Sequence, residues 1–128
     1  MGSHMRVIFI CRSTSIEADI CIERLRSLGV VVKVIFSDSR NESISLDLMG
    51  CDIDLIITYQ CYWKIPDQVL AQTIYGGINF HPAPPEYRGS GGYCWALYDN
   101  ASSYGITIHR LSSDIDSGEI LKVLRFPI

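Results

Sequence analysis

An amide and an imidazole stand two residues apart in the short apolar run Ile78-Asn79-Phe80-His81. Side chains two apart in an extended strand point to the same side, so Asn79 and His81 are expected to face one pocket. A carboxylate follows later, where Asp116 lies in the glycine-containing turn 113–118. An amide donor, an imidazole and a carboxylate suit acyl transfer without a covalent intermediate.

The segments that must position these groups alternate between strand and helix patterns. Apolar, β-branched runs predict strands, and apolar residues three or four apart predict helices. Thr14 and Glu17 fit a capping box at the start of the first helix, Gly29 fits its C-terminal cap, and Pro66 suits the first turn of the second helix. The expected strands are 6–11, 30–36, 53–59, 74–80, 105–111 and 119–127. The expected helices are one between the capping box and Gly29, one from 66 to about 72, and one from 91 or 92 to 98.

This order predicts an α/β fold: a Rossmann-like open, mostly parallel sheet with helices on both faces and a C-terminal antiparallel hairpin. Ligands of such sheets bind beyond the carboxyl ends of the strands. His81 ends one strand there, and the aromatic loop 60–64 follows another. The loop after the first strand lacks Gly-x-Gly-x-x-Gly, and the chain has no Gly-Lys-Ser/Thr, which argues against dinucleotide and phosphate-loop sites.

Composition narrows the class of protein. Residues 1–4 look like a cloning remnant, leaving 5–128 as a single domain. A net charge of −3 without a basic stripe argues against a nucleic-acid partner. No apolar stretch is long enough to cross a membrane and no signal-peptide pattern occurs, so we expect a cytoplasmic location. The five scattered cysteines read as reduced thiols, mostly core filler, and no zinc-ligand spacing is present.

Four motifs in chain order resemble the formyltransferase family of glycinamide ribonucleotide, methionyl-tRNA and sugar N-formyltransferases. They are 78–82 (Ile-Asn-Phe-His-Pro), 87–89 (Tyr-Arg-Gly), 104–109 (Tyr-Gly-Ile-Thr-Ile-His) and 114–120, and the match extends over about residues 53–127. The resemblance implies that N10-formyltetrahydrofolate is the formyl donor and co-substrate, that a primary amine is the acceptor, and that no metal is needed. It assigns the catalytic triad to Asn79, His81 and Asp116.

The resemblance also places a pterin pocket between the loop after the third strand and the Asp114–Asp116 turn. The implied cofactor-binding residues are Tyr59, Cys61, Tyr62, Trp63, Asp114 and Ile115. Tyr62 and Trp63 are equally compatible with ordinary rim aromatics, and Asp114 with a simple turn former. His109 could touch the site or belong to a structural face, and Arg88 could bind an anion or form a structural ion pair.

For the acceptor we expect a small molecule, with a nucleotide-linked amino sugar as the preferred class, because the low basic charge disfavours tRNA. The chain stops at Ile128, earlier than the relatives. Two alternatives stay open: a truncated, non-catalytic folate-binding or interaction module, and a hydrolase that passes the formyl group of formyltetrahydrofolate to water. The last strand would leave a sheet edge, a candidate surface for a homodimer.

Overall fold

The computed structural model describes residues 4–39, 52–87, 91–111 and 118–128. Strands and helices alternate through most of this length, as expected. The elements are β1 (Arg6–Cys11), α1 (Ile16–Ser27), β2 (Val31–Phe36), β3 (Leu55–Tyr59), α2 (Asp67–Leu70), β4 (Gly77–His81), α3 (Gly92–Tyr98), β5 (Ser103–Arg110) and β6 (Ile120–Pro127).

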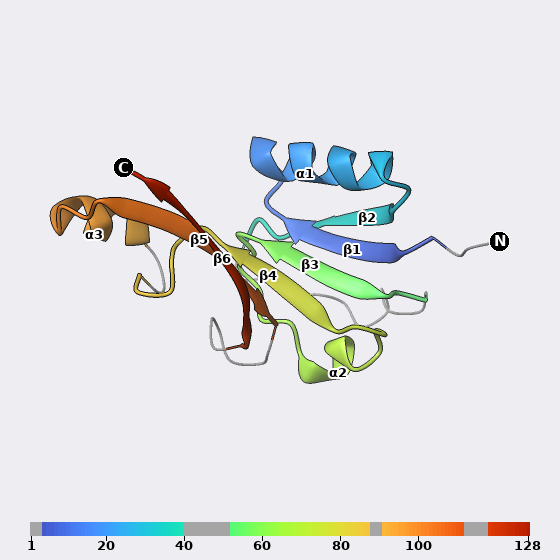
Figure 1. Ribbon diagram of the computed structural model, residues 1–128. Helices are drawn as coiled ribbons and strands as arrows, with labels where there is room; N and C mark the ends of the chain where they lie inside the picture. The colour runs from blue at the N-terminus through green and yellow to red at the C-terminus, as the bar shows by residue number, and fades with distance from the viewer. Residues whose placement is uncertain (1–3, 40–51, 88–90, 112–117) are drawn as a thin grey trace.

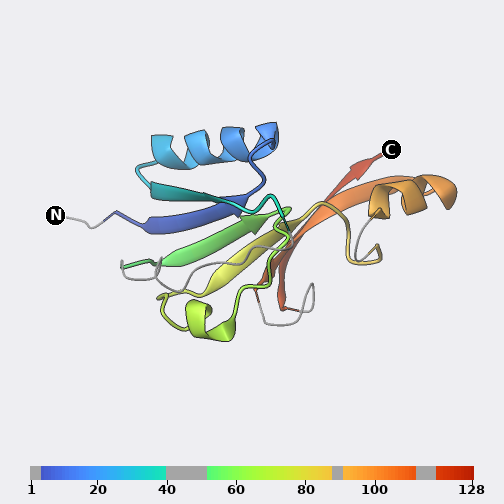
Figure 2. The same cartoon turned by 180° about the vertical axis from the view of Figure 1, so that it is seen from behind.

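The strands form one six-stranded sheet in the order β2-β1-β3-β4-β5-β6 (Figure 1). The first four strands in this order run parallel, and β5 and β6 are antiparallel to their neighbours. Helices α1 and α2 lie on opposite faces of the sheet, as the two views agree (Figures 1 and 2). The predicted fold class is therefore confirmed. Strand β6 is one of the two edge strands, and a homodimer through it stays a prediction.

Each face of the sheet carries its own apolar layer. Strand β1 is buried on both faces, which explains its unbroken apolar sequence. Its residues Val7 and Phe9 pack with Ile22 of α1 on one face. Ile8 and Ile10 pack on the other face with a second buried group, Ile53, Ile56, Ile65 and Val69, which extends to α2. The two faces are called the α1 face and the α2 face below.

The first helix starts differently from the prediction. Ser15, not Thr14, is its N-cap: the backbone N–H of Ala18 donates to the Ser15 hydroxyl oxygen at 3.1 Å. The proposed Thr14 and Glu17 capping box is therefore wrong, because the residue with the extended backbone that a cap requires is the next one along. At the other end, Gly29 has φ +88, a left-handed conformation that confirms its role after the helix.

The second helix is shorter than predicted. Pro66 precedes α2 as its N-cap instead of forming its first turn, and the helix ends at Leu70. Strand β4 starts at Gly77, three residues later than expected, because Thr73 and Gly76 close a turn in which the Gly76 N–H donates to the Thr73 hydroxyl at 2.7 Å. Ile74 consequently lies exposed in that turn. Short apolar runs do not show which of their residues enter a sheet.

The cysteines within the described ranges are free: Cys11, Cys21, Cys61 and Cys94. Burial raises the pKa of Cys11 to about 11, so it stays a neutral thiol at physiological pH. Cys94 is exposed, so the interpretation as core filler does not hold for it. None of the described helices is long and apolar enough to span a membrane.

Candidate active site

Strand β4 brings two of the predicted catalytic residues to the same end of the sheet. Asn79 and His81 lie two apart, and His81 is the last residue of the strand. Across the sheet, Asn79 is paired with Thr58 of β3 on one side and with His109 of β5 on the other. Both neighbours are almost completely buried, whereas Asn79 is only partly buried. The Asn79 side chain therefore lies between two buried residues and is itself partly accessible to solvent.

A chain of hydrogen bonds holds the Asn79 side chain across the three strands. The Thr58 hydroxyl donates to Asn79 Oδ1 at 2.7 Å. Asn79 Nδ2 lies 2.9 Å from His109 Nε2, and His109 Nδ1 lies 3.1 Å from the carbonyl oxygen of Arg110. Because a carbonyl only accepts, His109 Nδ1 carries the hydrogen and Nε2 accepts from the amide. His109, left open by the sequence, therefore contacts the candidate site directly.

The turn after His81 is fixed by strand β5. The Ala83 N–H donates to the His81 carbonyl at 2.8 Å, the Thr107 hydroxyl donates to the Ala83 carbonyl at 2.7 Å, and the Tyr104 hydroxyl donates to the Pro82 carbonyl at 3.0 Å. Thr107 is also the partner of His81 in the strand register. These hydrogen bonds fix the backbone that follows His81, so His81 is held in position from both sides.

Thr107→Val is expected to lower the free energy of unfolding by about 1–3 kcal/mol, because it leaves the buried Ala83 carbonyl without its donor. Thermal or urea unfolding measures this change. Thr14→Val makes the same change at an exposed position and serves as the matched control. Equal stability of Thr107→Val and wild type would show that the Ala83 carbonyl finds another partner.

The loop after β3 is tied to the ends of the neighbouring strands. Arg12, just after β1, donates from Nε to the Gln60 carbonyl at 3.1 Å. Beyond β2, the Ser37 hydroxyl accepts from the Tyr62 N–H at 3.0 Å, and the Ser39 carbonyl accepts from Trp63 Nε1 at 3.0 Å. The aromatic loop therefore has a set conformation at the carboxyl edge of the sheet, where ligands of this architecture bind.

Three of the four described residues predicted to bind the cofactor lie along this loop. Cys61 and Trp63 pack against the apolar layer of the α2 face, the face that also carries Thr58 and Asn79. Burial raises the pKa of the Cys61 thiol, which keeps it neutral and unsuited to nucleophilic attack. The Tyr62 ring lies 4.1 Å below the Arg12 guanidinium carbon, a cation–π contact that fixes the ring.

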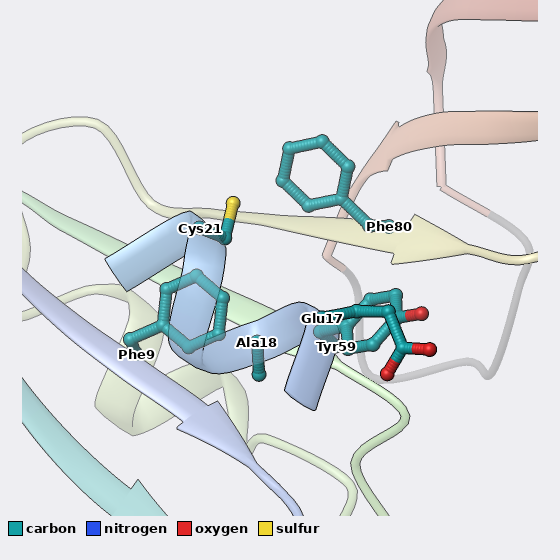
Figure 3. Close-up of a pocket in the computed structure, with 6 residues that line it drawn as sticks. All are labelled: Phe9, Glu17, Ala18, Cys21, Tyr59 and Phe80. Atoms are coloured by element: carbon teal, nitrogen blue, oxygen red, sulfur yellow. The ribbon is translucent and has the colours of Figure 1, made fainter. Parts of the chain in front are cut away.

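Tyr59 is separated from these residues by the sheet. It follows Thr58 in an extended strand, so its side chain lies on the α1 face. There it lines a cavity of about 110 Å³ together with Phe9, Glu17, Ala18, Cys21 and Phe80 (Figure 3). The structure thus does not bring the Tyr59 side chain together with Asn79, and this cavity is not part of the candidate site. Only main-chain groups of Tyr59 can contribute there.

The remaining predicted site residues, Asp114, Ile115 and Asp116, lie outside the described residues, as does Arg88. The described residues on either side of residues 112–117 contact the sheet: the Leu111 N–H donates to the Gly77 carbonyl at 2.9 Å, at the start of β4, and a Cβ at Gly118 would overlap the Arg110 carbonyl oxygen. The convergence of Asp116 with Asn79 and His81 stays a prediction.

Two residues of the site were not found from the sequence. Thr58 belongs to no recognisable sequence motif. The position of Arg12 over the Tyr62 ring depends on the loop conformation. The signal for Thr58 was the strand register, which a sequence alone does not give. In the described part of the chain, no group of three or more His, Cys, Asp or Glu side chains could hold a metal ion.

Comparison with known proteins decides the family. The sequence profile described as Formyl transferase matches residues 36–128, most of the chain, including β4, β5 and β6. The chain belongs to the formyl transferase family. Asn79, His81 and the turn leading to Gly118 all lie within the matched part of this formyl transferase domain.

Relatives of this formyl transferase domain act on different acceptors according to their names. It is 30% identical over 90 residues to a methionyl-tRNA formyltransferase of Listeria welshimeri, covering 70% of this chain and 29% of that protein. It is 34% identical over 71 residues to a GDP-perosamine N-formyltransferase of Brucella melitensis, covering 55% of this chain and 27% of that protein. The chain thus spans under a third of the length of these relatives.

Among solved structures, the fold is similar to HypX from Aquifex aeolicus, crystallised in complex with tetrahydrofolic acid. The TM-score is 0.82 at 25% identity, and the alignment covers 98% of this chain and 22% of HypX. The whole described fold is therefore shared with one part of a much larger folate-binding protein.

Proposed function

We propose that this domain transfers a formyl group from N10-formyltetrahydrofolate to the primary amine of a small acceptor. The observation that carries the proposal is the amide of Asn79. Its oxygen and one of its N–H groups are held by Thr58 and His109, and the other N–H meets no acceptor among the described residues. A fixed N–H donor on a partly exposed strand end is what the oxyanion of an acyl transfer needs.

Attack of the amine on the formyl carbon forms a C–N bond and moves the carbonyl electron pair onto oxygen. Asn79 donates its remaining N–H to that oxygen, and a protonated His81 supplies a second donor. One preorganised donor of this kind is worth ~3–4 kcal/mol of transition-state stabilisation. The bond from the formyl carbon to the folate nitrogen then breaks, and its electron pair returns to that nitrogen.

Two proton transfers complete the reaction. The attacking amine loses a proton and the folate nitrogen gains one, so the overall proton count does not change. We assign this exchange to His81, whose side-chain type titrates near neutral pH, with Asp116 orienting the imidazole or relaying through water. Neither step uses a cysteine, in line with the raised pKa of the Cys61 thiol.

We assign the pterin pocket to the loop after β3 and the turn containing Asp114, Ile115 and Asp116. Two observations favour this assignment: the loop is pinned to two neighbouring strand ends, and it carries Cys61, Tyr62 and Trp63. Main-chain donors and acceptors with flat apolar walls are suited to a planar heterocycle.

For the acceptor we favour an amino sugar carried by a nucleotide. The similarity to the GDP-perosamine enzyme supports this class, and the net charge of −3 offers no extended surface for a polyanionic RNA. The methionyl-tRNA enzyme is a relative of comparable identity, so tRNA belongs in the experiment as a competing acceptor.

The test is incubation of the protein with N10-formyltetrahydrofolate and a panel of nucleotide-linked amino sugars, free amino acids and initiator methionyl-tRNA. Mass spectrometry follows the formylated product, and absorbance follows tetrahydrofolate. A formylated amino sugar supports the proposal. Formate released without an acceptor would identify a hydrolase. Binding of tetrahydrofolate without turnover of any acceptor would identify a non-catalytic folate-binding module.

A further inference from the structure

The side chain of Asn79 could occupy its place in two orientations that differ by exchange of Oδ1 and Nδ2. Each orientation leaves one N–H without a bond to these neighbours, but at a different position, so only one orientation can match a given position of the reacting oxygen. The three neighbours on the α2 face decide the orientation. The deciding group is the main-chain carbonyl of Arg110, which accepts a hydrogen bond from the ring of His109.

The Arg110 carbonyl fixes the hydrogen of His109 on Nδ1, at 3.1 Å. A neutral ring then presents a bare Nε2, which can only accept, and the group 2.9 Å away must be the NH₂ end of Asn79. The oxygen end is left facing Thr58, whose hydroxyl can donate to it at 2.7 Å. In the reverse orientation the His109 ring would have to carry its hydrogen on Nε2 and turn a lone pair toward the carbonyl.

We propose that Thr58 is a positioning residue of the formyl-transfer site: its hydroxyl locks the Asn79 amide with one N–H free for the reacting oxygen. This inference rests on the proposed function. Thr58 is 2% exposed, so the hydroxyl cannot exchange its partner for water. Its place beside Asn79 in the parallel register means that the bond spans two strands and does not depend on any loop.

The position of Gly118 supports the same arrangement from the other side. A side chain there would overlap the Arg110 carbonyl oxygen, the atom that sets the His109 hydrogen. Because residue 118 is glycine, its backbone can approach the Arg110 carbonyl closely without displacing it. Next to it, the Arg110 N–H donates to the Glu119 carbonyl at 2.8 Å, which holds the peptide plane.

The test uses Thr58→Val, which keeps the branched shape and loses the hydroxyl, and Thr58→Ser, which keeps the hydroxyl. For Thr58→Val we expect kcat to fall about 3- to 10-fold with little change in KM for the folate donor, the size of one lost hydrogen bond. Thr58→Ser is expected to stay within about 2-fold of wild type. Thr14→Val, the same change at an exposed position before α1, is the control for the substitution itself.

A second measurement does not require turnover. Nitrogen-15 NMR of the wild type should show His109 with its hydrogen on Nδ1. In Thr58→Val the Asn79 side-chain amide should exchange hydrogen with water about 3- to 10-fold faster. A wild type without transferase activity would refute the proposed function and leave this measurement to decide the role of Thr58. A hydrogen on Nε2, an unchanged amide exchange rate in Thr58→Val, or an unchanged kcat in an active enzyme would each overturn the inference.

Discussion

Replacing Asn79 by aspartate is expected to reduce kcat for formyl transfer by about 100- to 1,000-fold. The new side chain has nearly the same shape but no N–H, so the developing oxyanion loses its donor and meets a carboxylate instead. His109 Nε2, which accepts from the amide 2.9 Å away, would then face an acceptor, so the hydrogen-bond chain would also reorganise. Single-turnover transfer kinetics measure the loss of the chemical step directly.

Two controls separate chemistry from folding and binding in this variant. Asn100→Asp makes the same change of charge at an exposed position after α3 and should leave kcat unchanged. Calorimetric titration with tetrahydrofolate should show affinity within a few-fold of wild type, because the amide is proposed to act on the transferred group. If Asn79→Asp kept more than half of the wild-type kcat, the amide could not be the oxyanion donor.

Replacing His81 by glutamine is expected to reduce kcat by about 100- to 10,000-fold, because glutamine can hydrogen-bond but cannot exchange a proton near neutral pH. Initial rates at saturating donor and acceptor measure the loss.

His4→Gln is the matched control for His81, since His4 is exposed at the start of the described chain. Thermal unfolding checks that the turn held by Thr107 and Tyr104 survives the substitution. If His81→Gln kept more than a tenth of the wild-type kcat, another group would have to transfer the proton. The imidazole would then have only an electrostatic or positioning role.

Comparing these variants also distinguishes the role of Asn79 from that of His81. Asn79 is tied into the sheet on both sides, so its loss should change the chemical step without moving the strand. His81 ends the strand and leads into a turn whose carbonyls are held by β5. A larger stability change is therefore expected for substitutions at the turn anchors than at either of the two polar residues.

Local periodicity in the sequence determined much of the secondary structure of this protein. The unbroken apolar run of β1 predicted a strand buried on both faces, and its predicted limits agree with the structure. The spacing of two between Asn79 and His81 placed them on one side of a strand end, because alternation in a strand is a property of the backbone alone. The four motifs at 78–82, 87–89, 104–109 and 114–120 together were enough to find the family, which the sequence comparison confirms.

Tertiary structure decided what surrounds those residues. Thr58, Asn79 and His109 come from three strands. They meet because the crossover through α2 places β3 beside β4, and the connection through α3 returns β5 antiparallel on the other side of β4. The same alternation that unites Asn79 with Thr58 sends Tyr59 to the other face, although its sequence position beside the aromatic loop suggested a pocket residue. Strand neighbours depend on the path of the whole chain, which no short stretch of sequence encodes.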